Sequence, residues 1–111
     1  MGKKLIIANW KMNFTIGEAS LFVHKLADAV ANHRDIEVVL APSAIALQSI
    51  SLQAHKHHFK LAAQNFYWRD EGAFTGEVSA NQLRGLVQYA LVGHSERRHV
   101  FGELSRDIRN K

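Results

Sequence analysis

The chain has 111 residues, of which 47% are hydrophobic and 22% charged, with a formal net charge of +4 and no cysteine. This length suits one domain, residues 1–111, with a real core. The lack of cysteine excludes disulfides, thiolate metal sites and a cysteine nucleophile, and it is compatible with the reducing cytoplasm, where we expect the protein. Lys and Arg are scattered, so the positive charge favours a small anionic ligand over a nucleic acid.

The first third of the chain predicts a strand and then a helix. Residues 5–8 are continuously apolar, which is typical of a strand buried on both faces, and the run is too short for a signal peptide or a membrane span. Thr15 and Glu18 form a capping box that opens a helix. A turn is predicted at residues 32–35. The helix carries an apolar stripe with the spacing of a helix packed on a sheet: Ala19, Phe22, Val23, Leu26 and Val30.

A second strand and helix follow. Residues 36–41 predict another buried strand, which Pro42 ends. Ser43 is positioned to cap a short helix over residues 44–54. The segment His55-Lys56-His57-His58 has metal-binding side chains, but it lies away from the other polar strand ends, so we expect a solvated turn and no metal.

The third strand is predicted at residues 61–63, ending in Gln64-Asn65, and a long aperiodic segment follows it over residues 66–77. Loops of that length are usually functional. The loop carries several aromatic side chains, and a partner surface is one place where they could be buried. Its apolar aromatics are Phe66, Tyr67, Trp68 and Phe74.

The last third of the chain repeats the pattern. Ser79 and Gln82 form a second capping box and open a helix. Residues 89–92 predict a fourth buried strand, followed by the polar run His94-Ser95-Glu96-Arg97-Arg98. Ser105 is positioned to cap a helix that runs to Lys111.

Alternating strands and helices with apolar strands predict an α/β protein with a parallel sheet. Three strand ends carry polar chemistry, at Asn9 and Lys11, at Gln64 and Asn65, and at His94 and Glu96. Ligands bind at the carboxyl ends of strands in such folds. A flavodoxin-like open sheet and part of a (β/α)8 barrel both fit this pattern. No Gly-rich fingerprint follows the first strand, which argues against a dinucleotide site.

Four of these side chains could act on a small anion. Lys11 offers a permanent cation, although it could also be a surface lysine. His94 could act as an acid, a base or an electrophile near neutral pH, or be structural. Glu96 could be a base, or it could pair with Lys11 and hold its rotamer. Asn9 could bind a substrate oxygen or cap its own turn. Composition and spacing alone thus predict no more than an α/β protein with a polar site for a small anion.

Four separate motifs resemble the triosephosphate isomerase family, in the family's order and at close to its spacing. They are residues 8–13 (ANWKMN), 63–65 (AQN), 72–77 (GAFTGE) and 93–98 (GHSERR). The resemblance covers the chain from Lys4 onward. It implies a TIM (β/α)8 barrel of which this chain holds the first four β/α units, a half-barrel with parallel strands. It also implies interconversion of dihydroxyacetone phosphate and glyceraldehyde 3-phosphate through an enediolate, in glycolysis and gluconeogenesis.

The resemblance also assigns roles. Asn9 and Lys11 would bind the substrate, with Lys11 neutralising the phosphate and the developing enediolate. His94 would be a neutral electrophile, a role for which this enzyme is itself the standard example, so it is taken from the family. Ser95 and Glu96 would support the site, with Glu96 holding Lys11. Phe74 and Thr75 would contact the neighbouring subunit of a homodimer, and no cofactor is implied.

One departure from the family is large. A complete barrel needs roughly 250 residues, and the family's catalytic glutamate motif, closing lid and Gly-rich phosphate loops have no match here. We therefore expect an amino-terminal fragment that is inactive by itself. It would belong to a working isomerase whose other half is supplied elsewhere, or it would be a non-catalytic half-barrel that serves as an assembly or folding unit. A second copy or a complementary half-barrel is the expected partner.

Overall fold

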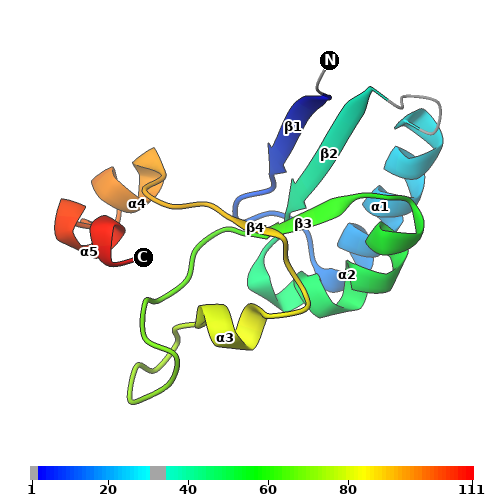
Figure 1. Ribbon diagram of the computed structural model, residues 1–111. Coiled ribbons are helices and arrows are strands. Elements are labelled where there is room, and N and C mark those ends of the chain that lie inside the picture. Colours follow the sequence, from blue (N-terminus) through cyan, green and yellow to red (C-terminus); the bar gives the residue numbers. More distant parts are fainter. Residues whose placement is uncertain (1–2, 31–34) are drawn as a thin grey trace.

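Four parallel strands form one sheet in the order β1-β2-β3-β4 (Figure 1). The computed structural model describes residues 3–30 and 35–111, so most of the turn predicted at 32–35 lies outside the described residues. The pairing of β1 with β2 runs from Lys4 opposite Ile36 to Asn9 opposite Ala41. The strands are β1 (Lys4–Asn9), β2 (Ile36–Ala41), β3 (Lys60–Ala63) and β4 (Tyr89–Ala90).

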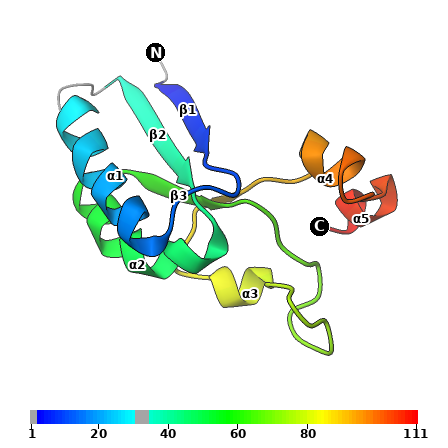
Figure 2. The ribbon, with the colours of Figure 1, turned by 180° about the vertical axis from the view of Figure 1, so that it is seen from behind.

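The two long helices lie together on one face of the sheet, whereas the two helices at the carboxyl end lie apart from them (Figures 1 and 2). The helices are α1 (Ile16–Val30), α2 (Ala44–Lys56), α3 (Ala80–Leu83), α4 (Ser95–His99) and α5 (Ser105–Asn110). This is the arrangement of the first four β/α units of a (β/α)8 barrel, opened into a half-barrel. In residues 3–30 and 35–111, no helix is both long and apolar enough to cross a membrane.

The main core lies between the sheet and the helices α1 and α2. It is built from the apolar stripe of α1, the buried face of α2 and alternate residues of β2 and β3, with Val23, Leu40, Leu47 and Ile50 no more than 1% exposed. The opposite face of the sheet holds only a small cluster of Val39, Ala41 and Ala62 with Leu91 against it. The sheet is therefore well packed on its helical side.

Both predicted capping boxes are confirmed. The Thr15 N–H donates to Glu18 Oε1 at 2.9 Å, and the Glu18 N–H donates to Thr15 Oγ1 at 3.3 Å. The Thr15 N–H also lowers the pKa of the Glu18 carboxyl. The Ser79 N–H donates to Gln82 Oε1 at 3.0 Å, and the Gln82 N–H donates to Ser79 Oγ at 3.1 Å. Each box satisfies two N–H groups that a helix start leaves open.

The predicted burial of the outer strands is wrong. The side chains Leu5, Ile6 and Ile7 of β1 are between 44% and 49% exposed. The fourth strand is shorter than the predicted 89–92, and its two residues are exposed. Both strands are edges of a four-stranded sheet, and among the described residues no layer covers the face that a closed barrel would turn inward.

Two predicted caps also differ from the structure. Ser43 occupies the N-cap position of α2, but its side chain makes no capping hydrogen bond. Ser105 is the first residue of α5 rather than its cap, and the Asp107 carboxylate accepts from the Leu104 N–H at 3.0 Å instead. The helix α2 continues to Lys56, two residues beyond its predicted end, because the N–H groups of the following turn bond its last carbonyls.

Candidate active site

Polar residues from three strand ends meet at the carboxyl edge of the sheet. The Lys11 ammonium lies 2.7 Å from Glu96 Oε1. The side-chain amide of Gln64 donates to the carbonyl of Lys11 at 2.9 Å and to that of Ala41 at 2.8 Å. Residues that follow β1, β3 and β4 are thus connected at one edge, together with the last residue of β2, as the strand-end pattern predicted.

The Lys11 backbone adopts an unusual conformation. Its φ is 57°, in the left-handed region that residues with a Cβ rarely occupy. Asn9 Oδ1 accepts from the Lys11 N–H at 2.9 Å and so stabilises this turn. Asn9 therefore caps its own turn through its oxygen. Strained backbone held in this way is often found where a side chain must be aimed at a ligand.

Glu96 is well suited to hold Lys11 and poorly suited to act as a base. The hydrogen bond from the Lys11 ammonium lowers the pKa of the Glu96 carboxyl, and this outweighs the opposing effect of burial. A carboxylate with a lowered pKa is a weaker proton acceptor. Lys11 and Glu96 keep 51% and 45% of their side chains exposed, so a ligand can reach the ammonium.

His94 occupies the N-cap of α4 with one ring nitrogen engaged. Its Nδ1 accepts from the Glu96 N–H at 3.1 Å. Accepting requires an unprotonated Nδ1, so the proton of the neutral ring lies on Nε2. Nδ1 also lies 3.8 Å from Glu96 Oε2. The side chain is 31% exposed, so part of it remains accessible to solvent.

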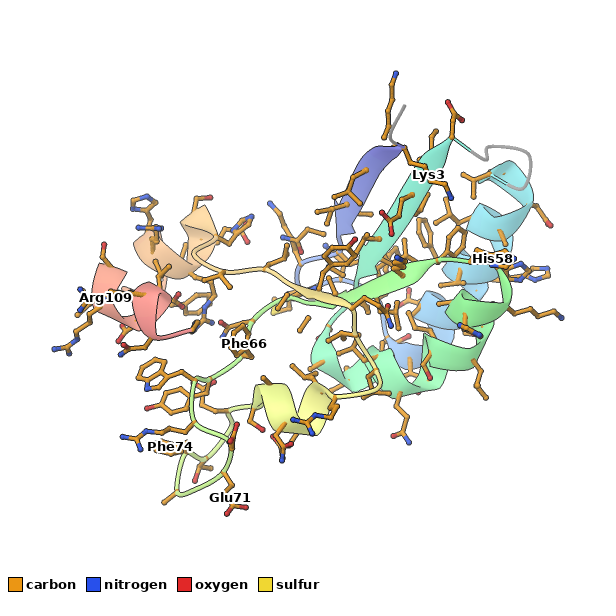
Figure 3. The ribbon with its side chains drawn as sticks, viewed as in Figure 1. Lys3, His58, Phe66, Glu71, Phe74 and Arg109 are labelled. Carbon is orange, nitrogen blue, oxygen red and sulfur yellow. The ribbon has the colours of Figure 1, made fainter. Side chains whose placement is uncertain are left out.

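The long loop after β3 holds its aromatic side chains largely against one another. The rings of Tyr67 and Trp68 stack with centroids 4.1 Å apart, and the Phe74 ring lies 4.4 Å from that of Tyr67. Figure 3 shows Phe74 and Glu71 at the outer part of this loop, far from the opposite end of the sheet at Lys3. Phe66, where the loop leaves β3, packs against the core.

The loop exposes Phe74 and Thr75, the two residues predicted to contact a neighbouring subunit. Phe74 is 38% exposed, and Thr75 beside it is exposed. Gly72 has a φ of 139°, and a Cβ there would meet the Phe74 ring at 2.8 Å, so this position requires glycine. The loop therefore has a defined shape that presents Phe74 and Thr75. Ser95 is exposed as the first residue of α4.

A buried charge cluster near the site was missed by sequence reasoning. Glu103 Oε2 lies 2.9 Å from the Lys111 ammonium and 3.1 Å from Arg97 Nε. Lys111 also donates to Asn65 Oδ1 at 2.6 Å. Glu103 and Lys111 are each only 5% exposed. Charged residues in a short polar tail give no periodic signal of burial, so the pattern could not reveal this cluster.

The three histidines and one lysine of residues 55–58 lie at the end of α2 and in the turn after it. His55, Lys56 and His58 are exposed, as the prediction of a solvated turn requires. Across residues 3–30 and 35–111, no group of three or more His, Cys, Asp or Glu side chains is arranged to hold a metal ion.

Together, the parallel half-barrel and the cation, imidazole and carboxylate gathered at its strand ends define a protein of the (β/α)-barrel class with a polar cluster at the carboxyl edge of its sheet. The family model described as triosephosphate isomerase matches residues 4–111, and the chain belongs to this family.

Curated relatives agree along the whole chain. It is 43% identical to the triosephosphate isomerase of Pelobacter propionicus, 44% identical to that of Alkaliphilus metalliredigens and 45% identical to that of Acetivibrio thermocellus. Each of these matches covers 100% of this chain and 45% of the relative. The chain therefore spans slightly less than half the length of the curated relatives it matches, and it matches their amino-terminal part.

Proposed function

We propose that this chain provides the first four β/α units of a triosephosphate isomerase that works in the cytoplasm, in glycolysis and gluconeogenesis. The reaction would interconvert dihydroxyacetone phosphate and glyceraldehyde 3-phosphate through an enediolate. The observation that carries the proposal is the joint placement of Lys11, Glu96 and His94. The Glu96 carboxylate pairs with the Lys11 ammonium, and the Glu96 backbone N–H donates to Nδ1 of His94.

The roles follow from the geometry and the family. The Lys11 ammonium would neutralise the substrate phosphate and the negative charge that develops on the enediolate oxygen. His94 would donate from Nε2 to the substrate carbonyl, because Nδ1 already accepts from the Glu96 N–H. Asn9 would bind a substrate oxygen through its amide Nδ2, since its Oδ1 accepts from Lys11. Ser95 would support the start of α4.

The proton transfer at carbon needs a base that these residues do not supply. In the family, that base is a glutamate on a later strand, and residues 1–111 contain no match to its motif. The remaining β/α units would supply the base and the phosphate loops. No metal or cofactor has a role in this proposal, since proton transfer and charge stabilisation account for the chemistry.

A second candidate function is that of a half-barrel assembly unit. The exposed apolar side chains of β1 favour it, because Leu5 and Ile7 lie on the sheet face that a closed barrel would turn inward, and Ile6 on the other face is exposed as well. A complementary half-barrel, or a second copy of this chain, would cover the face of Leu5 and Ile7, and Phe74 and Thr75 would contact a neighbouring subunit. The mass of the purified species, checked for a second polypeptide, separates the candidates, and a clean monomer in light scattering at micromolar concentration would count against an assembly unit.

The isomerase proposal is tested by joining residues 1–111 to the remaining β/α units of a family member. The joined protein should isomerise glyceraldehyde 3-phosphate in a coupled assay. His94→Gln should lower kcat by about 10²–10³-fold, as expected when a donor to a developing oxyanion is lost. His58→Gln, at the other end of the sheet, is the matched control and should leave the rate unchanged. If His94→Gln were as active as the parent, the assigned electrophile would be wrong.

A further inference from the structure

The helices α4 and α5 form a small terminal lobe, defined as residues 94–111. In Figures 1 and 2 this lobe lies apart from α1 and α2 and is joined to the sheet by the extended stretch after β4. Within residues 3–30 and 35–111, the Arg98 side chain bonds the carbonyl of the adjoining Gly93, and two polar side-chain contacts connect the lobe to parts of the chain before β4. They are the Lys11–Glu96 ion pair and the hydrogen bond from Lys111 to Asn65.

These two attachments differ in exposure. The Lys11–Glu96 pair is about half exposed on both sides, whereas Lys111 and its partner Glu103 are each 5% exposed. An exposed pair stabilises little, because water competes with it and the long side chains lose freedom. A buried pair is costly to break, because a charge is then left without a partner. The Glu103–Lys111 pair therefore holds the Lys111 ammonium in place within the lobe, and the hydrogen bond from Lys111 to Asn65 attaches the lobe to the loop after β3.

Two series of polar contacts connect the Glu103–Lys111 pair to Lys11. In one series, Lys111 bonds Asn65, and the adjacent Gln64 donates to the Lys11 carbonyl at 2.9 Å. In the other series, Glu103 bonds Arg97, and the adjacent Glu96 pairs with the Lys11 ammonium. The backbone and the side chain of Lys11 are thus both held by residues next to a partner of the Glu103–Lys111 pair.

We propose that Glu103 and Lys111 form a clamp that positions Lys11, by fixing the terminal lobe against the loop after β3. Lys111 is a positioning residue, since it touches the site only through Asn65 and Glu103. Its importance for catalysis rests on the proposed isomerase function, but the clamp itself is a property of residues 1–111. The clamp can therefore be tested without any activity.

The test follows the Glu96 carboxyl by NMR in the 111-residue chain, with 13C-labelled glutamate. The pKa of Glu96 is lowered first of all by the hydrogen bond from Lys11, so it reports whether that contact persists. Lys111→Met removes the clamp cation and keeps an unbranched side chain. It should raise the pKa of Glu96 toward its ordinary value of 4.5. Lys56→Met, an exposed lysine at the end of α2, should leave it unchanged.

Glu18 is the internal control for folding, because its pKa is lowered by Thr15 at the start of α1 and involves no residue of the lobe. A higher pKa of Glu96 with an unchanged pKa of Glu18 supports the clamp, and an unchanged pKa of Glu96 overturns it. If Lys111→Met also raises the pKa of Glu18, the chain has unfolded, and the variant Asn65→Ala is then used to test the clamp. Asn65→Ala removes the hydrogen bond to Lys111 but leaves the Glu103–Lys111 pair. Asn65→Ala should then raise the pKa of Glu96 with Glu18 unchanged, and an unmoved Glu96 would refute the clamp. A failed isomerase assay would leave this result unaffected.

Discussion

Two ion pairs on the terminal lobe have similar lengths but should differ sharply in their contribution to stability. The Lys111–Glu103 distance is 2.9 Å and the Lys11–Glu96 distance is 2.7 Å. Only the first pair is buried, with 5% of each side chain exposed. Glu103→Gln keeps the shape of the side chain but leaves the buried Lys111 ammonium without its counter-charge. We expect this change to cost the lobe about 3–5 kcal/mol, the usual loss when a buried pair is broken.

Native-state amide hydrogen exchange measures this loss within the lobe. The reporter is the Ile108 N–H, which donates at 3.2 Å to the carbonyl of Leu104, the N-cap residue of α5. A loss of about 3 kcal/mol corresponds to exchange about 150-fold faster, since each 1.4 kcal/mol is a factor of ten. If the lobe is less stable than this, Ile108 should instead reach the rate of an unprotected peptide.

The matched control is Glu96→Gln, which should leave Ile108 exchange nearly unchanged because its pair is exposed. Amides of the buried strand β2, such as Val39, should keep their protection in both variants. Equal acceleration in Glu103→Gln and Glu96→Gln would refute the reasoning, since exposure would then not decide the strength of the two pairs. Unchanged exchange in Glu103→Gln would refute it as well.

Three further predictions concern pH, catalysis and assembly. Burial raises the pKa of Glu103, but hydrogen bonds from Lys111 and Arg97 outweigh it and hold the pKa below the ordinary 4.5. This pair therefore stabilises the lobe above about pH 4.5, and the protection of the Ile108 amide, relative to an unfolded peptide at the same pH, should decrease as the pH falls below that value, but less so in Glu103→Gln. In the joined eight-unit protein, Lys11→Ala should lower kcat by about 10²–10³-fold with the fold intact by far-UV CD, and Glu96→Gln should cost less; the reverse order would mean that the two roles are exchanged. Thr75→Arg should shift the native assembly toward smaller species in light scattering without altering far-UV CD, and an unchanged size would exclude the loop from an interface.

Local signals in the sequence predicted local structure well. The capping boxes at Thr15 and Ser79 involve residues three apart, so the chain itself brings the partners together. Ser43 and Ser105 carry the same preference for a cap, but neither forms the bond. A single capping residue is thus a weaker signal than a reciprocal pair. The apolar runs located all four strands for the same local reason.

The burial of side chains and the contacts between distant residues could not be predicted from local signals in the sequence. The run at residues 5–8 has the composition of a buried strand, but its exposure depends on which elements cover it in space. The strand-end rule predicted that Lys11, Gln64 and Glu96 would meet, because parallel strands bring their carboxyl ends to one edge. The pairing of Lys111 with Glu103 and Asn65 follows from the packing of the lobe, which no periodic pattern encodes.

The central claim is that residues 1–111 carry the Lys11 and His94 part of an isomerase site but not its base. The most direct measurement is a coupled isomerase assay on the purified chain, alone and mixed with a polypeptide that carries the remaining β/α units. A positioned base contributes about 10²–10⁴-fold, and the phosphate loops add to this through orientation. The chain alone should therefore show no turnover above background, and mixing should restore it. Ordinary enzymatic turnover by the chain alone, or none in a mixture shown to assemble, would contradict the account.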